Sequence, residues 1–231
     1  MSNDRDKPDN DSETGEDKLA ESRPKLVESK ERWAREGRLL TGRAAAHGER
    51  LPPGQHLVRD WPVLDLGVDP EVKAETWHLT VNGLVEKPLR WNWAELLAQP
   101  QFHDVSDIHC VTAWSRFDNE WDGVSAKHIL SLVRPKADAR FVIFHSFDDF
   151  TTNLPLADFD DDDVLIAHSW QGQPLPGEHG RPVRAIVPKL YFWKSAKWLK
   201  RIEIVARDRA GFWEERGYHD HGDPWVEERY G

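Results

Sequence analysis

The sequence predicts an α+β domain built from mixed sheets with short helices. Apolar residues alternate with period two over several short segments, such as 76–81 and 198–206, which is the pattern of half-buried strands. Segments with helical spacing are few and short, and they do not fall regularly between the strands. A doubly wound parallel sheet needs a helix after each strand, so the α+β class is preferred.

The N-terminal region is expected to lie outside the main domain. Residues 1–24 are rich in Asp, Glu, Ser, Asn and Lys, so we expect a disordered acidic tail. Residues 25–49 are expected to form a short helical or extended segment. Within 24–38, three apolar residues recur among many charges and predict a marginal amphipathic helix: Leu26, Val27 and Trp33.

The main domain is expected over residues 50–231, with its elements in a definite order. After a loop over 51–55 and an extended segment over 56–66, strands are predicted over 76–81, 105–112, 141–147, 183–187 and 198–206, with a short apolar stretch at 164–167. The dipeptide Asn82-Gly83 signals a hairpin after the first of these strands. Short helices are predicted over 93–98, where Pro100 ends the helix, and over 125–133, where Ser125 is the N-cap.

Composition excludes several classes of function. The chain has 231 residues and a net charge of −10, so electrostatic nucleic-acid binding is not expected. No apolar run approaches the roughly 20 residues that span a bilayer, and residues 1–23 lack the apolar core of a signal peptide. With one cysteine and no such signal, we expect a cytoplasmic protein.

The single cysteine, Cys110, is the centre of the functional question. A lone thiol cannot form an internal disulfide, so it either packs as a small hydrophobic group or uses its sulfur in chemistry. Its neighbours include His109, Thr112, Trp114 and Ser115, an unusually polar and aromatic setting for a core position. Composition alone leaves both interpretations open.

Basic residues downstream of Cys110 suggest anion binding. Arg184 begins a buried apolar strand after the turn at 179–182, where an unpaired guanidinium is costly, so it needs an internal carboxylate or a bound phosphate. The run 194–197 (Lys-Ser-Ala-Lys) is either an anion site or an exposed basic turn. One thiolate donor with separated anion-binding groups suits a large anionic cofactor held in part by a metal–sulfur bond.

Two other polar clusters carry weaker signals. The acidic run 158–163 lacks the ligand spacing and glycine of a calcium loop, so a solvated turn is favoured. His219 and His221 form a His-x-His pair with no accompanying metal framework.

At the level of whole motifs, the chain resembles the sulfite oxidase superfamily. The resemblance runs in order over roughly 50–231, through the segments 109–115, 121–124, 151–156, 179–184, 194–199, 211–214 and 217–219. It is strongest to small single-domain sulfite oxidase-like proteins and extends to the catalytic subunit of the periplasmic methionine sulfoxide reductase. The resemblance implies the sulfite oxidase-type fold and a mononuclear molybdenum centre on molybdopterin.

The resemblance also implies roles for particular residues. Cys110 takes the position of the thiolate that binds molybdenum, and it is therefore both the metal ligand and the catalytic candidate. The implied cofactor-binding residues are Arg59, Ser146, His179, Arg184, Ser195 and Lys197. Arg116 is a further candidate for the substrate pocket.

The activity implied is a two-electron redox step or oxygen-atom transfer on a small-molecule substrate, with an external protein as electron donor or acceptor. The chain has no haem-binding segment, and we do not expect haem or the dimerisation domain of full-length sulfite oxidases. The substrate is left open. Two alternatives stay open as well: a degenerate binding or assembly module that uses its tryptophans, and a cofactor-carrying subunit of an electron-transfer complex.

Overall fold

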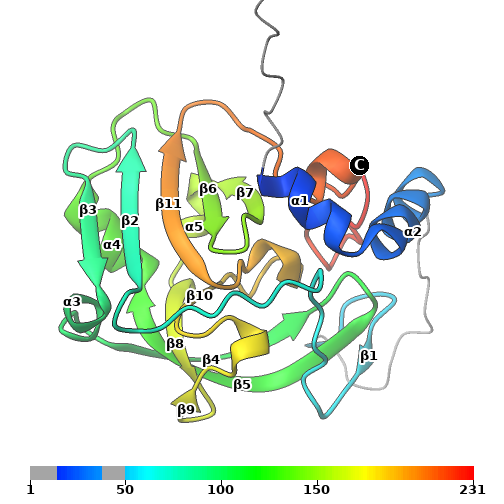
Figure 1. Ribbon diagram of the computed structural model, residues 1–231, viewed down its shortest axis with the longest axis horizontal. Coiled ribbons are helices and arrows are strands. Elements are labelled where there is room, and N and C mark those ends of the chain that lie inside the picture. Colours follow the sequence, from blue (N-terminus) through cyan, green and yellow to red (C-terminus); the bar gives the residue numbers. More distant parts are fainter. Residues whose placement is uncertain (1–14, 38–49) are drawn as a thin grey trace, which may run out of the picture.

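Two mixed β-sheets form the body of the protein in the computed structural model, which describes residues 15–37 and 50–231 (Figure 1). In the first sheet the order is β1-β5-β8-β10, with β4 paired to β5 and β9 to β8. Only the β1–β5 pair is parallel. The strands are β1 (His56–Leu57), β4 (Phe102–His109), β5 (Trp114–Ser125), β8 (Leu165–Trp170), β9 (Gln173–Pro174) and β10 (Arg184–Ile186).

The second sheet has the order β3-β2-β11-β6-β7. Its central strand, β11, runs parallel to β2 and antiparallel to β6. The strands are β2 (His78–Gly83), β3 (Leu89–Asn92), β6 (Phe141–Ser146), β7 (Thr151–Pro155) and β11 (Leu199–Val205). Mixed sheets with few short helices confirm the predicted α+β class.

The helices are short, and local sequence explains where two of them begin. The Asn92 side chain accepts the Glu95 backbone N–H at the start of α3 (Trp93–Leu97), while Glu95 accepts the N–H of Asn92 in return. Ser125 accepts the His128 N–H and caps α4 (Ala126–Val133), as predicted. The other helical elements are α5 (Leu156–Phe159) and the 3-10 turns η2 (Gly177–His179), η3 (Phe192–Lys194) and η4 (Glu214–Arg216). No helix in the described ranges is long and apolar enough to cross a bilayer.

The main core is formed by apolar residues that the strand periodicity predicts. Leu79 and Val81 on β2 and Ile202 and Ile204 on β11 are fully buried, because alternate residues of a strand face the same side. A second apolar cluster surrounds Cys110 and contains several of the tryptophans. A cavity that Cys110 helps to line lies at this second cluster.

Parts of the strand prediction are wrong. The predicted hairpin is present, since β2 and β3 pair antiparallel, but its turn lies after Gly83 and not at Asn82-Gly83. Gly83 is the last residue of β2; its φ is +91° and its backbone approaches Ile204 closely. The prediction misses β5 and β7, because the run of polar residues in β5 gives no period-two pattern. Cys110 follows β4 directly, at the exit of the predicted strand.

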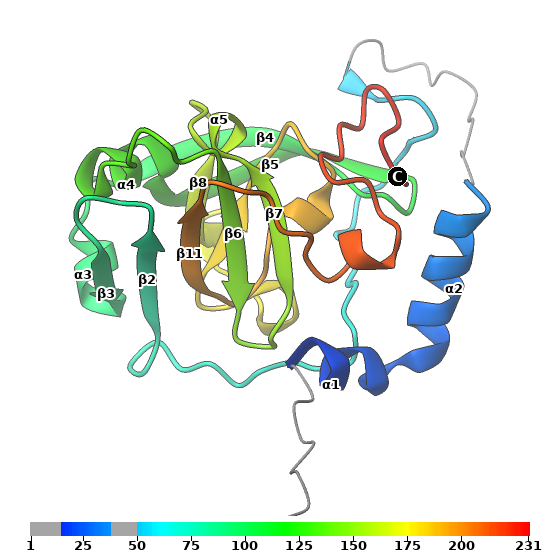
Figure 2. The same cartoon turned by 90° about the horizontal axis from the view of Figure 1, so that it is seen from above.

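Two N-terminal helices lie along one side of the domain, near the C-terminal segment (Figure 2). The tail expected to be disordered is helical in part, since Gly15–Ser22 forms α1. The reason is Leu19, which is only 2% exposed and packs in a small apolar cluster with Val27, Leu66 and Phe212. The predicted amphipathic helix is present as α2 (Pro24–Arg35). The rest of the expected tail (1–14) and of the linking segment (38–49) lies outside the described residues.

Candidate cofactor site

Cys110 lies in a tight turn between β4 and β5. The Cys110 N–H donates to the Trp114 carbonyl (2.8 Å), and the Ala113 N–H donates to the Cys110 carbonyl (3.0 Å). Ala113 has a φ of 74°, a conformation that L-residues adopt rarely and that narrows this turn. The Sγ atom lies 3.2 Å from the Thr112 hydroxyl, and Cys110 is 6% exposed.

Residues from distant parts of the chain support this turn. The Gln55 side-chain amide donates to the Cys110 carbonyl (3.1 Å), and Ser115 Oγ donates to Gln55 Oε1 (3.3 Å). The Arg229 guanidinium, which is fully buried, donates to the Val111 carbonyl (2.5 Å). The turn is therefore tied on both sides of Cys110, so the position of its sulfur is well fixed.

Burial raises the pKa of the Cys110 thiol, while the Thr112 hydroxyl and the positive charges of Lys30 and Arg229 act in the opposite direction. A thiol in this setting keeps its proton until a stronger positive charge replaces it. A bound metal ion does so, because a coordinating thiol is deprotonated outright.

Arg184, at the start of β10, is 2% exposed and has neutral hydrogen-bond partners. Its guanidinium donates to the carbonyls of His179 (2.9 Å) and Ser195 (2.8 Å), and it lies 4.2 Å from the centre of the Phe192 ring. Burial lowers the pKa of Arg184 to about 9. The internal carboxylate that the sequence allowed as its partner is thus not among its contacts in the described residues.

Lys197 likewise has neutral hydrogen-bond partners. Its ammonium donates to the carbonyls of Leu64 (3.1 Å) and Glu178 (2.9 Å) and lies 4.1 Å from the centre of the Trp198 ring. Burial and the charge of Arg184 lower the pKa of Lys197 to about 8. The two cations therefore hold positive charge that carbonyl dipoles only partly offset.

His179 is held between these cations and an aromatic ring. Its ring stacks on Trp61 with a centroid distance of 3.7 Å and an interplanar angle of 6°. Burial first, and then the charges of Arg184 and Lys197, lower the pKa of His179 to about 3. The imidazole is thus neutral at physiological pH and can offer one N–H donor and one acceptor.

A single cavity joins these groups. Its volume is about 170 Å³, room for on the order of ten water molecules and therefore for an organic group. Six of the seven residues implied by the resemblance line it: Cys110, Ser146, His179, Arg184, Ser195 and Lys197. They come from segments up to 87 residues apart in the sequence.

Arg59 and Arg116 are not among the residues that line the cavity. The chain bends at residues 59–60, which leaves Arg59 exposed and brings Trp61 into the cavity wall. The Arg116 Nε–H donates to the Arg59 carbonyl (3.1 Å), so the two residues support each other away from the cavity. Arg59 as a cofactor-binding residue therefore stays a prediction from the resemblance, and Trp61 rather than Arg59 lines the cavity.

The polar groups of the cavity fit an anionic organic cofactor with a metal bound to sulfur. Ser146 Oγ and Trp114 Nε1 are buried and have no hydrogen-bond partner among the described residues. Buried polar atoms of this kind cost free energy until a ligand satisfies them. Together with the carbonyl-bound cations Arg184 and Lys197 and the thiol of Cys110, they provide a sulfur ligand, two positive charges and two free polar atoms.

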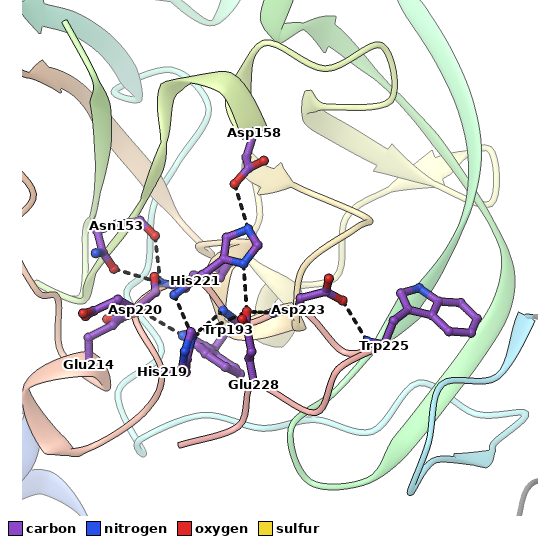
Figure 3. A network of polar contacts seen from close by, with 12 residues as sticks. Asn153, Asp158, Trp193, Glu214, His219, Asp220, His221, Asp223, Trp225 and Glu228 are labelled. Carbon is purple, nitrogen blue, oxygen red and sulfur yellow. Dashed lines mark hydrogen bonds and ion pairs between the residues drawn. The ribbon is translucent and has the colours of Figure 1, made fainter. Parts of the chain in front are cut away.

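Lys194 does not belong to this set. Its ammonium forms an ion pair with Glu214 (2.7 Å) and donates to the Asn153 side-chain oxygen (2.8 Å), with both charged groups fully buried. In the same region, the His221 ring bridges Glu228 (2.8 Å) and Asp158 (3.0 Å) (Figure 3). These contacts hold the C-terminal segment on the domain. In the described part of the chain, no group of three His, Cys, Asp or Glu side chains could hold a metal ion.

The prediction from sequence misses Asp148, which also lines the cavity. Burial raises the pKa of this carboxyl to about 6, although it accepts the Phe150 N–H. It lies in the turn between β6 and β7, two residues after Ser146. The acidic dipeptide 148–149 in a turn is common on protein surfaces, so the sequence offers no signal that separates it from a solvated turn.

The fold and these groups suit a protein that holds a large anionic cofactor. Comparison with known proteins agrees: residues 66–213, more than half of the chain, match the family described as "Oxidoreductase molybdopterin binding domain". The chain belongs to this family, within the sulfite oxidase superfamily, and is a molybdopterin-binding oxidoreductase.

Two curated relatives differ in how much of their length the chain covers. "Uncharacterized oxidoreductase YuiH" of Bacillus subtilis is 45% identical over 182 residues, 78% of this chain and 92% of that protein. "Putative protein-methionine-sulfoxide reductase subunit YedZ1" of Azospira oryzae is 32% identical over 149 residues, 64% of this chain and 56% of the relative. The chain thus spans only about half of the second protein.

A solved structure supports the fold alone. The "Sulfane Dehydrogenase SoxCD" of Paracoccus pantotrophus matches with a TM-score of 0.55 and 23% identity, over 60% of this chain and 40% of that chain.

Proposed function

We propose that this oxidoreductase carries a mononuclear molybdenum centre on molybdopterin, with Cys110 as the protein ligand of the metal. One observation carries the proposal: Cys110 and the cations Arg184 and Lys197 line the same cavity. Cys110 supplies the only thiolate that the chain can offer to a metal, since it is the one cysteine. When bound, the group supplies two-electron redox chemistry and oxygen-atom transfer.

The chain's own residues bind and orient the cofactor. Arg184 and Lys197 attract its anionic part, and the carbonyl contacts described above keep both side chains in place. Ser195 accepts two hydrogen bonds. Its carbonyl accepts from the Arg184 guanidinium, and its hydroxyl accepts from the Val187 N–H (2.9 Å). Ser146 offers a free hydroxyl to the same ligand.

Aromatic side chains exclude water from much of the cavity. Trp61, Trp114, Phe192 and Trp193 are among its lining residues. A site lined in this way strengthens each electrostatic contact inside it, because the local dielectric constant is low. A small-molecule substrate reaches such a site, whereas a second protein supplies or removes the electrons from outside.

The proposal is tested by analysis of the purified protein from a host that makes molybdopterin. We expect about one molybdenum per chain, together with the fluorescent product of pterin oxidation. Protein that is folded but free of both would contradict the proposal and favour the degenerate binding module instead.

The electron partner and the location in the cell are separate proposals. The relatives named as reductase subunits support an external redox partner for this chain as well. Co-purification at low ionic strength from the native cell tests this, because transient electron-transfer interfaces are small. Cytoplasmic location stays a prediction, and cell fractionation with detection of the native protein tests it.

A further inference from the structure

Helix α2 contributes to the wall of the cofactor cavity, although it precedes the family match, which begins at residue 66. Leu26 and Lys30 of this helix line the same cavity as Cys110. Figure 2 shows α2 beside the C-terminal segment, on one side of the two sheets. A segment outside the family domain thus faces the place where chemistry is proposed.

The helix is docked against the domain. Val27 is 5% exposed and packs in the small apolar cluster with Leu66 and Phe212. Arg23, the residue before the helix, forms an ion pair with Asp65 (3.3 Å). Residues 65–66 and Phe212 thus hold α2 against the domain. Packing therefore sets the direction of its cavity-facing side chains.

Lys30 brings a charge to the cavity wall that no carboxylate of the described residues balances. Its side chain is half-buried, and its ammonium lies 4.1 Å from the centre of the Trp33 ring. In residues 15–37 and 50–231, no carboxylate lies within ion-pair distance of this ammonium. Burial lowers the pKa of Lys30 while Cys110 raises it, so the ammonium is within electrostatic reach of the sulfur.

The other two cavity cations are placed differently. Arg184 and Lys197 are fixed by carbonyl groups of the segments around residues 178–195, and the proposed function assigns them to the cofactor. Lys30 comes from another element and has no hydrogen-bonded carbonyl among its contacts in the described residues. Its ammonium contacts the Trp33 ring but makes no hydrogen bond to the described residues, so it can donate to a ligand that enters the cavity.

We propose that Lys30 binds the anionic group of the substrate, which makes α2 a specificity element of the site. The proposal rests on the proposed function, since it takes the reaction to occur at a metal centre bound by Cys110. The ligand chemistry is an oxyanion or a carboxylate, because a half-buried ammonium without a counter-charge gains most from a negatively charged oxygen. An anionic part of the cofactor has the same chemistry, and the experiment separates the two sources.

The test compares Lys30→Met and Lys30→Arg in the cofactor-loaded, full-length protein. The probes are nitrate and sulfate, with binding measured by isothermal titration calorimetry. We expect Lys30→Met to weaken anion binding about tenfold, as for loss of one charge-assisted contact, and Lys30→Arg to restore most of it. Lys25→Met is the matched control, since Lys25 is exposed on the same helix and its loss changes the net charge equally.

Three results would overturn the assignment. The first is anion binding that is undetectable in the wild type or unchanged in Lys30→Met. The second is equal weakening in Lys25→Met, which would indicate a general charge effect. The third is loss of molybdenum and pterin from Lys30→Met alone, which would assign Lys30 to the cofactor.

The failure of the proposed function has a different signature. Wild-type protein free of molybdenum and pterin would contradict the proposed function, whatever the anion titrations give. If anion binding in that protein still depended on Lys30, the anion site on α2 would be supported independently of the cofactor.

Discussion

The cavity has a sulfur side and a cation side, which the protein builds in different ways. On the sulfur side, the turn at 109–114 is held by neutral hydrogen bonds, by Gln55 and by Arg229, so the position of one atom is fixed. On the cation side, Arg184 and Lys197 donate to carbonyl groups, and no carboxylate among the described residues forms an ion pair with either of them. The first arrangement suits directional metal ligation and the second suits binding of a charged group. Substitutions on the two sides should therefore have separable effects.

Arg184→Met should have the largest effect of the cavity substitutions. It leaves the carbonyls of His179 and Ser195 without a donor in a buried site, which costs about 3 kcal/mol in the free energy of unfolding. It also removes a charge that binds the cofactor, so pterin content should fall to a small fraction of the wild-type value. Urea unfolding of the cofactor-free protein and pterin fluorescence measure the two effects.

Arg184→Lys is the control for charge. It keeps a positive charge but lacks the forked geometry that reaches both carbonyls, so we expect intermediate stability and intermediate pterin content. Full pterin content in Arg184→Met would mean that the cation side does not bind the cofactor.

Arg229→Met should come next and should act on the sulfur side. Loss of the contact to the Val111 carbonyl leaves a buried acceptor unpaired, at a cost of about 2 kcal/mol. Because the turn then loses one of its supports, we expect the molybdenum-to-pterin ratio to fall while pterin is retained. Metal analysis and pterin fluorescence on the same sample measure this ratio.

Arg216→Met is the matched control. Arg216 donates to the Phe212 carbonyl (2.7 Å) in the same C-terminal region, away from the turn that carries Cys110. It should lower stability without changing the molybdenum-to-pterin ratio. An equal change in this ratio for both variants would show that Arg229 has no particular role at the sulfur side.

The sequence predicts the main residues of both sides of the cavity, but not every residue that it places there lines the cavity. Motif resemblance identified Cys110, Arg184 and Lys197, and all three line the cavity. It also named Arg59, which does not line the cavity, because a bend at 59–60 leaves this residue exposed and no local pattern encodes a bend of that kind.

Contacts between distant segments are also beyond a local reading of the sequence. Local signals, Pro100 as the end of α3 and Ser125 as the cap of α4, located both helices correctly. The segment that forms α1 is predicted to be disordered because its few apolar residues give no helical pattern. The docking of Leu19 and the contact of Glu16 with the Thr151 hydroxyl stabilise the helix, and both join it to distant segments. The support of the Cys110 turn by Arg229 joins residues 118 apart, so it becomes visible only in three dimensions.

A smaller effect, on the pH dependence of stability, should distinguish Asp148 from the sulfur side and the cation side of the cavity. Burial raises the pKa of Asp148 to about 6, against an ordinary value of 3.8, with Lys197 and Asp149 as its charged neighbours. Between pH 4 and pH 6 the folded state therefore binds more protons than the unfolded state, so the stability contributed by this group falls as pH rises through that window. After allowance for solvent screening, the change is about 1 kcal/mol.

Asp148→Asn should remove this pH dependence. Chemical unfolding of the cofactor-free wild type and variant at pH 4, 5, 6 and 7 gives the difference directly. We expect the variant to gain stability relative to the wild type as pH rises, with a plateau above pH 7. A difference that is constant with pH would show that the carboxyl titrates normally.

Cys110→Ser should change stability least, and it isolates the role of the sulfur most cleanly. Serine is close to isosteric with cysteine, and the Thr112 hydroxyl next to it can accept or donate a hydrogen bond, so the unfolding free energy should change by less than about 1 kcal/mol. The cation side is intact in this variant, and pterin should therefore be retained. Turnover and the molybdenum–sulfur absorption should both be lost, because an alcohol is a far harder ligand with a much higher pKa. If turnover persisted in this variant, Cys110 would be a packed thiol rather than a ligand, and the site would have to be explained by the cation side alone.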